Sequence, residues 1–291
     1  MNAKGERIAL ASLIASGVLA GGNAVCIRFS NRELAPYWGA SLRFILAALL
    51  SVVVVLALRI KLPRGRALIG AALYGLFQFG GSFGLAYYAL VRIQAGLGQT
   101  LLALVPLATL LVAVAQRQER LRARAAVGAV VALGGVAVMS RASVGGSLPP
   151  LSLLAILGSV LCFAEAAVLV RRLPPVQPFA MNTVGMTSAA VFLLTIAAVK
   201  GEPFALPRRA ETRVAIAYIV VIGSVVVFAL ALVVLRHWEA SRYAYLFVLT
   251  PPITIVLSAW LDDERIGWGL LFGGVLILAG VYVGALRPAR S

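Results

Sequence analysis

The sequence predicts an all-α polytopic membrane protein with ten transmembrane helices, arranged as two inverted repeats of five. Three observations support this fold class. The 291 residues are 62% hydrophobic and only 12% charged, whereas soluble domains are about 45–50% apolar and about 25% charged. The apolar residues occur in runs of about 20, the length that crosses a bilayer as a helix. The second half of the chain also repeats the pattern of the first.

Ten apolar runs are long enough to span the membrane. We expect all of them to be helices, because the chain lacks the alternation of a barrel and backbone groups in lipid must be satisfied within the segment. The runs cover residues 8–30, 34–58, 67–91, 95–115, 123–140, 151–170, 178–199, 213–235, 241–261 and 267–286.

The net charge of +16 is spread over the gaps between these runs. Sixteen Lys and Arg residues fall in the two termini and the loops on the same side, and nine fall in the opposite loops. Because cytoplasmic loops are enriched in Lys and Arg, we expect both termini in the cytoplasm of a cell inner membrane. The chain offers no soluble module that would bind nucleic acid, so the lipid bilayer and a small-molecule substrate are the expected partners.

The cysteines and the histidine predict neither a metal site nor a cofactor. Cys26 and Cys162 lie inside apolar runs, where they are expected to be small buried residues rather than a disulfide. His237 stands alone in a loop, so no metal-ligating cluster is expected.

An internal repeat appears when the chain is shifted by 145 residues. "LLALVPLATLLVAVAQRQER" from Leu101 then aligns with "LFVLTPPITIVLSAWLDDER" from Leu246, and the match continues without a gap. It divides the chain into residues 1–145 and 146–291. Five helices per half is an odd number, so the second half is inverted in the membrane. Inverted repeats are the architecture of secondary transporters, with the substrate site between the repeats.

These segments, together with "LRFILAALL" in the second helix and "AILGSVLCFAEAAVLVRRL" in the sixth, resemble the drug/metabolite transporter superfamily in its ten-helix EamA-type form. The resemblance covers nearly the whole chain. It implies a transporter that exports amino acids, other metabolites or drugs by alternating access, and the chain looks most like the bacterial amino-acid exporters.

Arg43 interrupts an otherwise apolar helix, at a depth of about 10 Å. A charge inside a span costs about 2.5–3.5 kcal/mol on insertion scales. The arginine either pairs with helix-end carbonyls as a structural residue or holds a substrate carboxylate in a cavity. The resemblance favours the structural role, because an equivalent arginine occurs across the family whatever the substrate.

Glu165 is the acid that lies well inside a predicted span. A buried carboxylate can carry a proton or line a cavity, and a hydrogen-bonded structural acid is the alternative. The family pattern has an apolar or aromatic residue near this position. The four-helix multidrug relatives use a first-helix glutamate for proton-coupled cation binding.

Other polar residues are candidates for lining the cavity. The spacing of Tyr74, Gln78 and Ser82 places them on one stripe of the third helix. Asn23 and Gln99 are expected at about the depth of Arg43, where together they could bind the carboxylate of a zwitterion by hydrogen bonds. Tyr243 and Tyr245 begin the ninth helix, as gate residues or as part of an aromatic belt.

Pro106 and the pair Pro251-Pro252 interrupt backbone hydrogen bonds at equivalent places, so they are candidate hinges. The glycine-rich tenth helix carries Gly269-xxx-Gly273 and Gly280-xxx-Gly284. These glycines predict close packing, either within the chain or in a homodimer.

The leading functional interpretation is therefore a secondary exporter of small metabolites, foremost amino acids. A proton-coupled exporter of drugs or organic cations is the alternative. An intramembrane enzyme or a channel is disfavoured, because no catalytic constellation and no repeated charged ring is present.

Overall fold

The computed structural model describes residues 3–119, 123–141, 149–227, 230, 233–234 and 246–286. Within these residues the chain is helical, with no strand. The elements of the first half are α1 (Ala3–Asn31), α2 (Pro36–Ala57), α3 (Arg66–Gly75), η1 (Leu76–Gly81), α4 (Ser82–Leu90), α5 (Ala95–Leu102), α6 (Val105–Ala115) and α7 (Ala123–Arg141). Those of the second half are α8 (Pro150–Val170), α9 (Pro178–Val199), α10 (Ala210–Ala217), η2 (Tyr218–Val226), α13 (Leu246–Leu261), α14 (Trp268–Val281) and η3 (Tyr282–Leu286).

Eight of the predicted spans form helices that are long and apolar enough to cross a membrane. The eighth and ninth predicted spans are described only in part: α10 with η2 covers 210–226, and α13 begins at Leu246. The all-helical membrane fold is thus confirmed, whereas the count of ten extends into residues that the structure does not describe.

Proline and left-handed residues set several helix ends. Helices α2, α8 and α9 each begin with a proline, whose missing N–H costs nothing in the first turn. Helices α2 and α9 both end in a left-handed residue, Arg59 with φ 52° and Gly201 with φ 65°. In each case the next residue returns a backbone hydrogen bond to the last turn, as in a Schellman cap.

The two candidate hinges differ in the structure. The fourth predicted helix divides into α5 and α6 at residues 103–104, just before Pro106, which lacks the N–H that would continue the ladder. In contrast, Pro251 and Pro252 lie inside α13, which is helical from Leu246 to Leu261.

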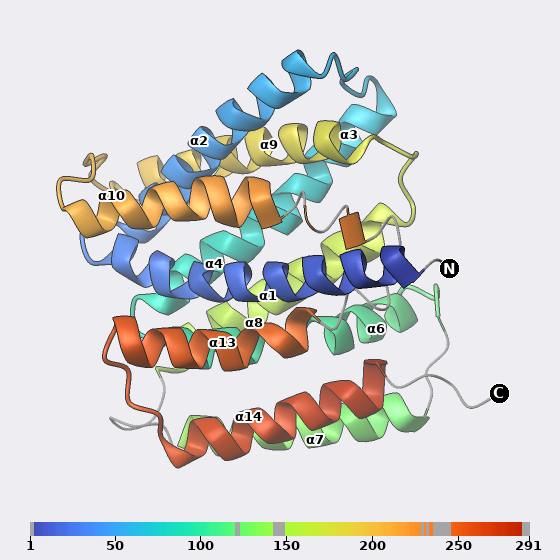
Figure 1. Cartoon of the computed structure of the whole chain (residues 1–291), viewed down its shortest axis with the longest axis vertical. Helices are drawn as coiled ribbons and strands as arrows, with labels where there is room; N and C mark the ends of the chain where they lie inside the picture. The colour runs from blue at the N-terminus through green and yellow to red at the C-terminus, as the bar shows by residue number, and fades with distance from the viewer. Residues whose placement is uncertain are drawn as a thin grey trace.

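Equivalent helices of the two halves pack against each other. Helices α7 and α14 lie side by side at one end of the elongated molecule, and α2 packs against α9 near the other end (Figure 1). Gly128 contacts Gly280 and Gly284, whereas Gly135 contacts Gly273. Because the contact positions run in opposite directions, α7 and α14 are antiparallel, as inverted repeats require.

The glycines of α14 therefore pack against α7 of the same chain. A methyl group added at Gly280 would lie 2.5 Å from the Gly128 carbonyl oxygen, so the two backbones are in direct contact. A homodimer formed through α14 would have to use its other face, where Trp268, Phe272 and Val275 are exposed.

The repeat also fixes a turn in each half. The Glu119 N–H donates to the Ala113 carbonyl after α6, and the Glu264 N–H donates to the Ser258 carbonyl after α13. Both donors and both acceptors are 145 residues apart. The sequence repeat is thus also a repeat of backbone conformation.

Candidate substrate cavity

A cavity of about 120 Å³ lies between helices of both halves. Helices α1, α4 and α5 contribute from the first half, and α8 and α13 from the second. Its wall is mostly aliphatic, with phenylalanine rings and a few polar groups; these are Phe83, Phe163, Phe247, Asn23, Gln99 and Thr250. Ligand pockets usually measure about 300–1,000 Å³, so the helices must move apart before a metabolite can enter.

Two of the predicted polar residues meet in this cavity. Asn23 comes from α1 and Gln99 from α5. The side-chain oxygen of Asn23 is buried and has no hydrogen-bond partner among the described residues. The third polar residue, Thr250, already donates its hydroxyl to the Leu246 carbonyl at 2.6 Å. The Asn23 oxygen is therefore an unpaired acceptor at the cavity wall, packed against Gly223 of η2.

Arg43 lies behind the cavity wall, with 1% of its surface exposed. Its Nη2 donates a long hydrogen bond of 3.5 Å to the Ser224 hydroxyl. The guanidinium carbon lies 4.4 Å from the ring centre of Phe83 and 5.2 Å from that of Phe44. The Tyr87 hydroxyl lies beside it, outside hydrogen-bond geometry. Arg43 thus faces protein rather than lipid.

The predicted stripe on the third helix lies away from the cavity lining. Ser82 is fully buried and donates to the Gln78 carbonyl, while Tyr74 packs edge-on against Phe79. The physical reason is the π-helical segment η1, which lies between Tyr74 and Ser82 and changes the angular phase of the helix. Phe83, one residue beyond Ser82, lines the cavity instead.

Glu165 also lies away from the cavity lining. Both of its carboxylate oxygens accept from the Gln116 side-chain amide, at 2.9 and 2.7 Å. Gln116 directly follows α6, and Glu165 lies in the last turns of α8. The carboxylate is thus held near one end of the helix bundle. Tyr243 and Tyr245 fall outside the described residues.

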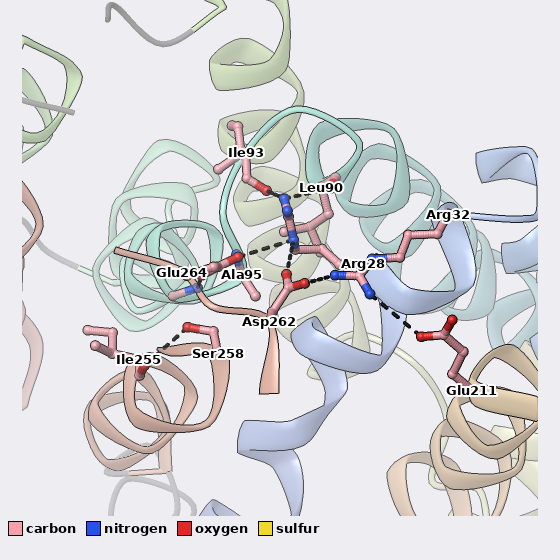
Figure 2. Close-up of polar contacts among 11 residues, drawn as sticks. Arg28, Arg32, Leu90, Ile93, Ala95, Glu211, Ile255, Ser258, Asp262 and Glu264 are labelled. Carbon is pink, nitrogen blue, oxygen red and sulfur yellow. Dashed lines mark hydrogen bonds and ion pairs between the residues drawn. The ribbon is translucent and has the colours of Figure 1, made fainter. Parts of the chain in front are cut away.

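A cluster of ion pairs lies next to the cavity residues Ile27 and Leu90, and the sequence did not reveal it. We call Arg28, Arg32, Asp262 and Glu264 the Arg28 cluster. Figure 2 shows the side chains of Arg28 and Arg32 converging on Asp262. Arg28 Nε lies 2.7 Å from Asp262 and 3.1 Å from Glu264, and its Nη1 donates to the Ile93 carbonyl at 2.7 Å. The cluster therefore joins the end of α1, the start of α5 and the loop after α13.

Glu264 serves a second purpose in this cluster. Its carboxylate accepts from the N–H groups of Ala95 and Gly96, at 2.6 and 3.2 Å, and so caps α5 where the positive end of the helix dipole favours an anion. The sequence signal was present in the repeated Glu-Arg loop, but the arginine that it faces is more than 230 positions away.

Related contacts occur at the opposite end of the bundle. Arg171, after α8, forms an ion pair of 2.5 Å with Glu119, and Arg172 donates to the Gln116 carbonyl at 3.0 Å. We call Gln116, Glu119, Glu165, Arg171 and Arg172, which these contacts join, the Arg171 cluster. Glu119 and Glu264 occupy equivalent positions in the two repeats. Glu119 of the first half contacts Arg171 after α8, and Glu264 of the second half caps α5. At each end, the equivalent acidic loop thus binds a helix of the other half.

Comparisons with known proteins agree with this architecture. The profile of the EamA-like transporter family matches the chain twice, over residues 7–141 and 150–285. The uncharacterized inner membrane transporter YedA of Escherichia coli K12 is 25% identical over 293 residues, covering 95% of this chain and 92% of YedA. YedA of Escherichia coli O157:H7 matches equally. A protein crystal structure shares the fold, with a TM-score of 0.67 at 18% identity over 98% of both chains. The chain therefore belongs to the EamA-like transporter family, and it is a multi-pass inner membrane protein.

Proposed function

We propose that this transporter exports small metabolites, foremost amino acids with aromatic or amphipathic side chains, by alternating access. The observation that carries the proposal is the cavity between the two halves. It combines the open oxygen of Asn23 and the amide of Gln99 with a wall of phenylalanine rings. Polar groups of this kind suit the constant part of an amino acid, and the rings suit side chains that vary.

The charges near the cavity support amino acids over organic cations. Arg43 lies next to the lining, behind Phe83, and its charge would repel a cation. The proton-coupled alternative relies on Glu165, whose carboxylate is engaged by Gln116 away from the lining.

The two ion-pair clusters support a rocking mechanism. The fourth predicted helix begins at Ala95 beside the Arg28 cluster and ends at Ala115 beside the Arg171 cluster. The two clusters therefore lie at opposite ends of this helix, as they would at opposite ends of a transport pathway. The halves 1–145 and 146–291 would rock about the cavity, with each cluster closing one end in turn. With both termini in the cytoplasm, the Arg28 cluster closes the periplasmic end.

The test is uptake of a panel of labelled amino acids into proteoliposomes, with and without an imposed proton gradient. We expect saturable uptake of several amino acids. The variants Asn23→Leu and Gln99→Leu should raise KM, whereas Asn182→Leu, a half-buried residue of α9 outside the cavity lining, should not. Absence of uptake for every amino acid, from protein shown to be folded, would contradict the proposal.

A further inference from the structure

Arg43 carries a buried charge that has aromatic rings and one hydroxyl beside it, but no carboxylate partner among the described residues. Its side chain is 1% exposed, and no carboxylate of the described residues lies within ion-pair distance. Nε and Nη1 make no hydrogen bond with any described residue. An unpaired charge in a low-dielectric interior is costly unless an ion of opposite charge joins it. The guanidinium therefore has two nitrogen atoms, with three N–H groups, and one charge available for an anion.

The described groups around Arg43 are uncharged. Cys26 and Tyr87 lie beside the guanidinium, and the Ser224 hydroxyl accepts its single long hydrogen bond. None of these supplies a counterion at neutral pH, because the ordinary pKa values of thiol and phenol groups lie near 8.5 and about 10. The missing negative charge must come from outside this shell.

Phe83 separates Arg43 from the cavity. One side of its ring covers the guanidinium at 4.4 Å, and the same side chain lines the cavity. Asn23, with its open oxygen, lines the cavity and contacts Gly223, the neighbour of Ser224. A rotation of the Phe83 ring would thus join the cavity to the arginine, next to an acceptor suited to an ammonium group.

We propose that Arg43 is the binding site for the carboxylate of the transported molecule, and that the Phe83 side chain covers this site when the cavity is empty. The substrates are then zwitterions or organic acids, with the carboxylate on Arg43 and the ammonium of a zwitterion on the Asn23 oxygen. This inference rests on the proposed transport of amino acids, and it adds a specificity determinant that rejects the matching amines.

Three ligands that share the benzyl side chain test the site. They are phenylalanine, 3-phenylpropionate, which lacks the ammonium, and phenethylamine, which lacks the carboxylate. We would measure the thermal unfolding midpoint of the detergent-solubilised full chain with each. Phenylalanine and 3-phenylpropionate should stabilise the protein, and phenethylamine should not. Arg43→Gln should weaken binding of both carboxylates at least about tenfold, as expected for the loss of charge-assisted hydrogen bonds.

Arg92→Gln is the matched control, because Arg92 is exposed beyond the end of α4 and the change in charge is the same. Equal stabilisation by phenethylamine, or unchanged carboxylate binding by Arg43→Gln, would overturn the proposal. Binding of 3-phenylpropionate distinguishes failure of this proposal from failure of the proposed function. If 3-phenylpropionate raises the unfolding midpoint only when Arg43 is present, the carboxylate site is supported even if no amino acid is transported.

A second variant decides the matter if Arg43→Gln does not fold. Phe83→Leu shortens the cover over the guanidinium, and should increase the affinity for 3-phenylpropionate without creating affinity for phenethylamine. Phe77→Leu is the control, because Phe77 lies on the adjoining segment η1 and is 37% exposed, away from the cavity. Equal effects of the two leucine variants on 3-phenylpropionate binding would overturn the role of Phe83 and, with it, the proposed access to Arg43.

Discussion

Arg28 donates a hydrogen bond of 2.7 Å from its Nε to the carboxylate of Asp262, a residue 234 positions further along the chain. The Asp262 side chain is 1% exposed, whereas that of Arg28 is 24% exposed. The bond joins the end of α1 to the loop after α13, which belong to different halves. A motion that moves the two halves apart at this end would separate these two residues.

Asp262→Asn should therefore loosen the Arg28 cluster. Because Glu264 remains 3.1 Å from Arg28, the arginine keeps one partner, and we expect a loss of about 1–3 kcal/mol of stability. The opening should also become more frequent. A cysteine placed at Ile27, which lines the cavity, should react faster with a membrane-impermeant maleimide in a background without native cysteines. The neighbouring variant Asp263→Asn, at an exposed position, is the control; equal labelling in both would contradict a latch role.

The contact between α7 and α14 predicts opposite effects at adjacent glycines. A methyl group at Gly135 would come within 2.6 Å of the Gly273 carbonyl oxygen and 2.9 Å of the Ile277 nitrogen, so the two helices must separate. We expect Gly135→Ala to destabilise the protein by about 1–3 kcal/mol. Gly134→Ala meets no atom within 4 Å and should stabilise it by up to about 1 kcal/mol through helix propensity. Thermal unfolding of the two variants compares them directly; destabilisation by both would mean that space is not the cause.

The placement of Glu165 predicts that its carboxylate is not needed for uptake. Gln keeps one acceptor oxygen for the Gln116 amide, which now bonds both carboxylate oxygens, and the side chain lies away from the cavity lining. Glu165→Gln should thus keep the amino-acid KM within about twofold of the wild type, because KM rises when an interaction with the substrate is removed and Glu165 lies outside the lining. Uptake with and without a proton gradient is the measurement. A gradient response present in the wild type and lost in the variant would make Glu165 the proton carrier.

Docking of the loop after α9 should depend on pH through Glu33. The Thr212 hydroxyl and the backbone N–H groups of Arg208 and Arg209 hold the pKa of the Glu33 carboxyl below its usual value. Its stabilising contribution is therefore complete above the ordinary pKa of about 4.3, and is lost as the pH falls through the lowered folded value.

The fluorescence of Trp38 is expected to report this loss, because its indole N–H donates to the Ala205 carbonyl at 2.7 Å and its ring contacts Phe204. Glu33→Gln should show a smaller change below pH 5, because only the Glu202 carboxylate, which accepts from the Trp38 N–H, is then left beside the reporter among the described residues. An acid transition that is identical in the variant would assign the titration to another group.

The helix positions could be predicted from the sequence because each depends on local composition. The predicted spans 95–115 and 178–199 match Ala95–Ala115 and Pro178–Val199 at both ends, where proline and loop residues mark the boundaries. The placement of Asn23 and Gln99 in one cavity followed from similar depth in the membrane. In contrast, the π-helical segments η1 and η2 have no composition that distinguishes them from α-helix, so the facing of Gln78 could not be predicted.

The long-range ion pairs could not be predicted from the sequence either. Nothing in the sequence around Arg28 distinguishes it from the other basic residues near the ends of the predicted spans. Its role depends on Asp262, and that proximity follows from the packing of α1 against α13, a tertiary contact. Repeat symmetry pointed to the Glu-Arg loops, but it did not say which arginine each loop meets.

The helix caps on the side of the Arg28 cluster have a consequence for biosynthesis. Glu264 caps α5, and Glu202 caps α2 by accepting from the Trp38 N–H at 2.7 Å. Both acids leave the ribosome long after the helices that they cap. When the first five helices are inserted, the first-turn N–H groups of α2 and α5 therefore lack these carboxylate acceptors. They gain both acceptors only after the loop that carries Glu264 has been translated. A chain truncated after its first half should insert into the membrane but remain a substrate for quality-control proteases.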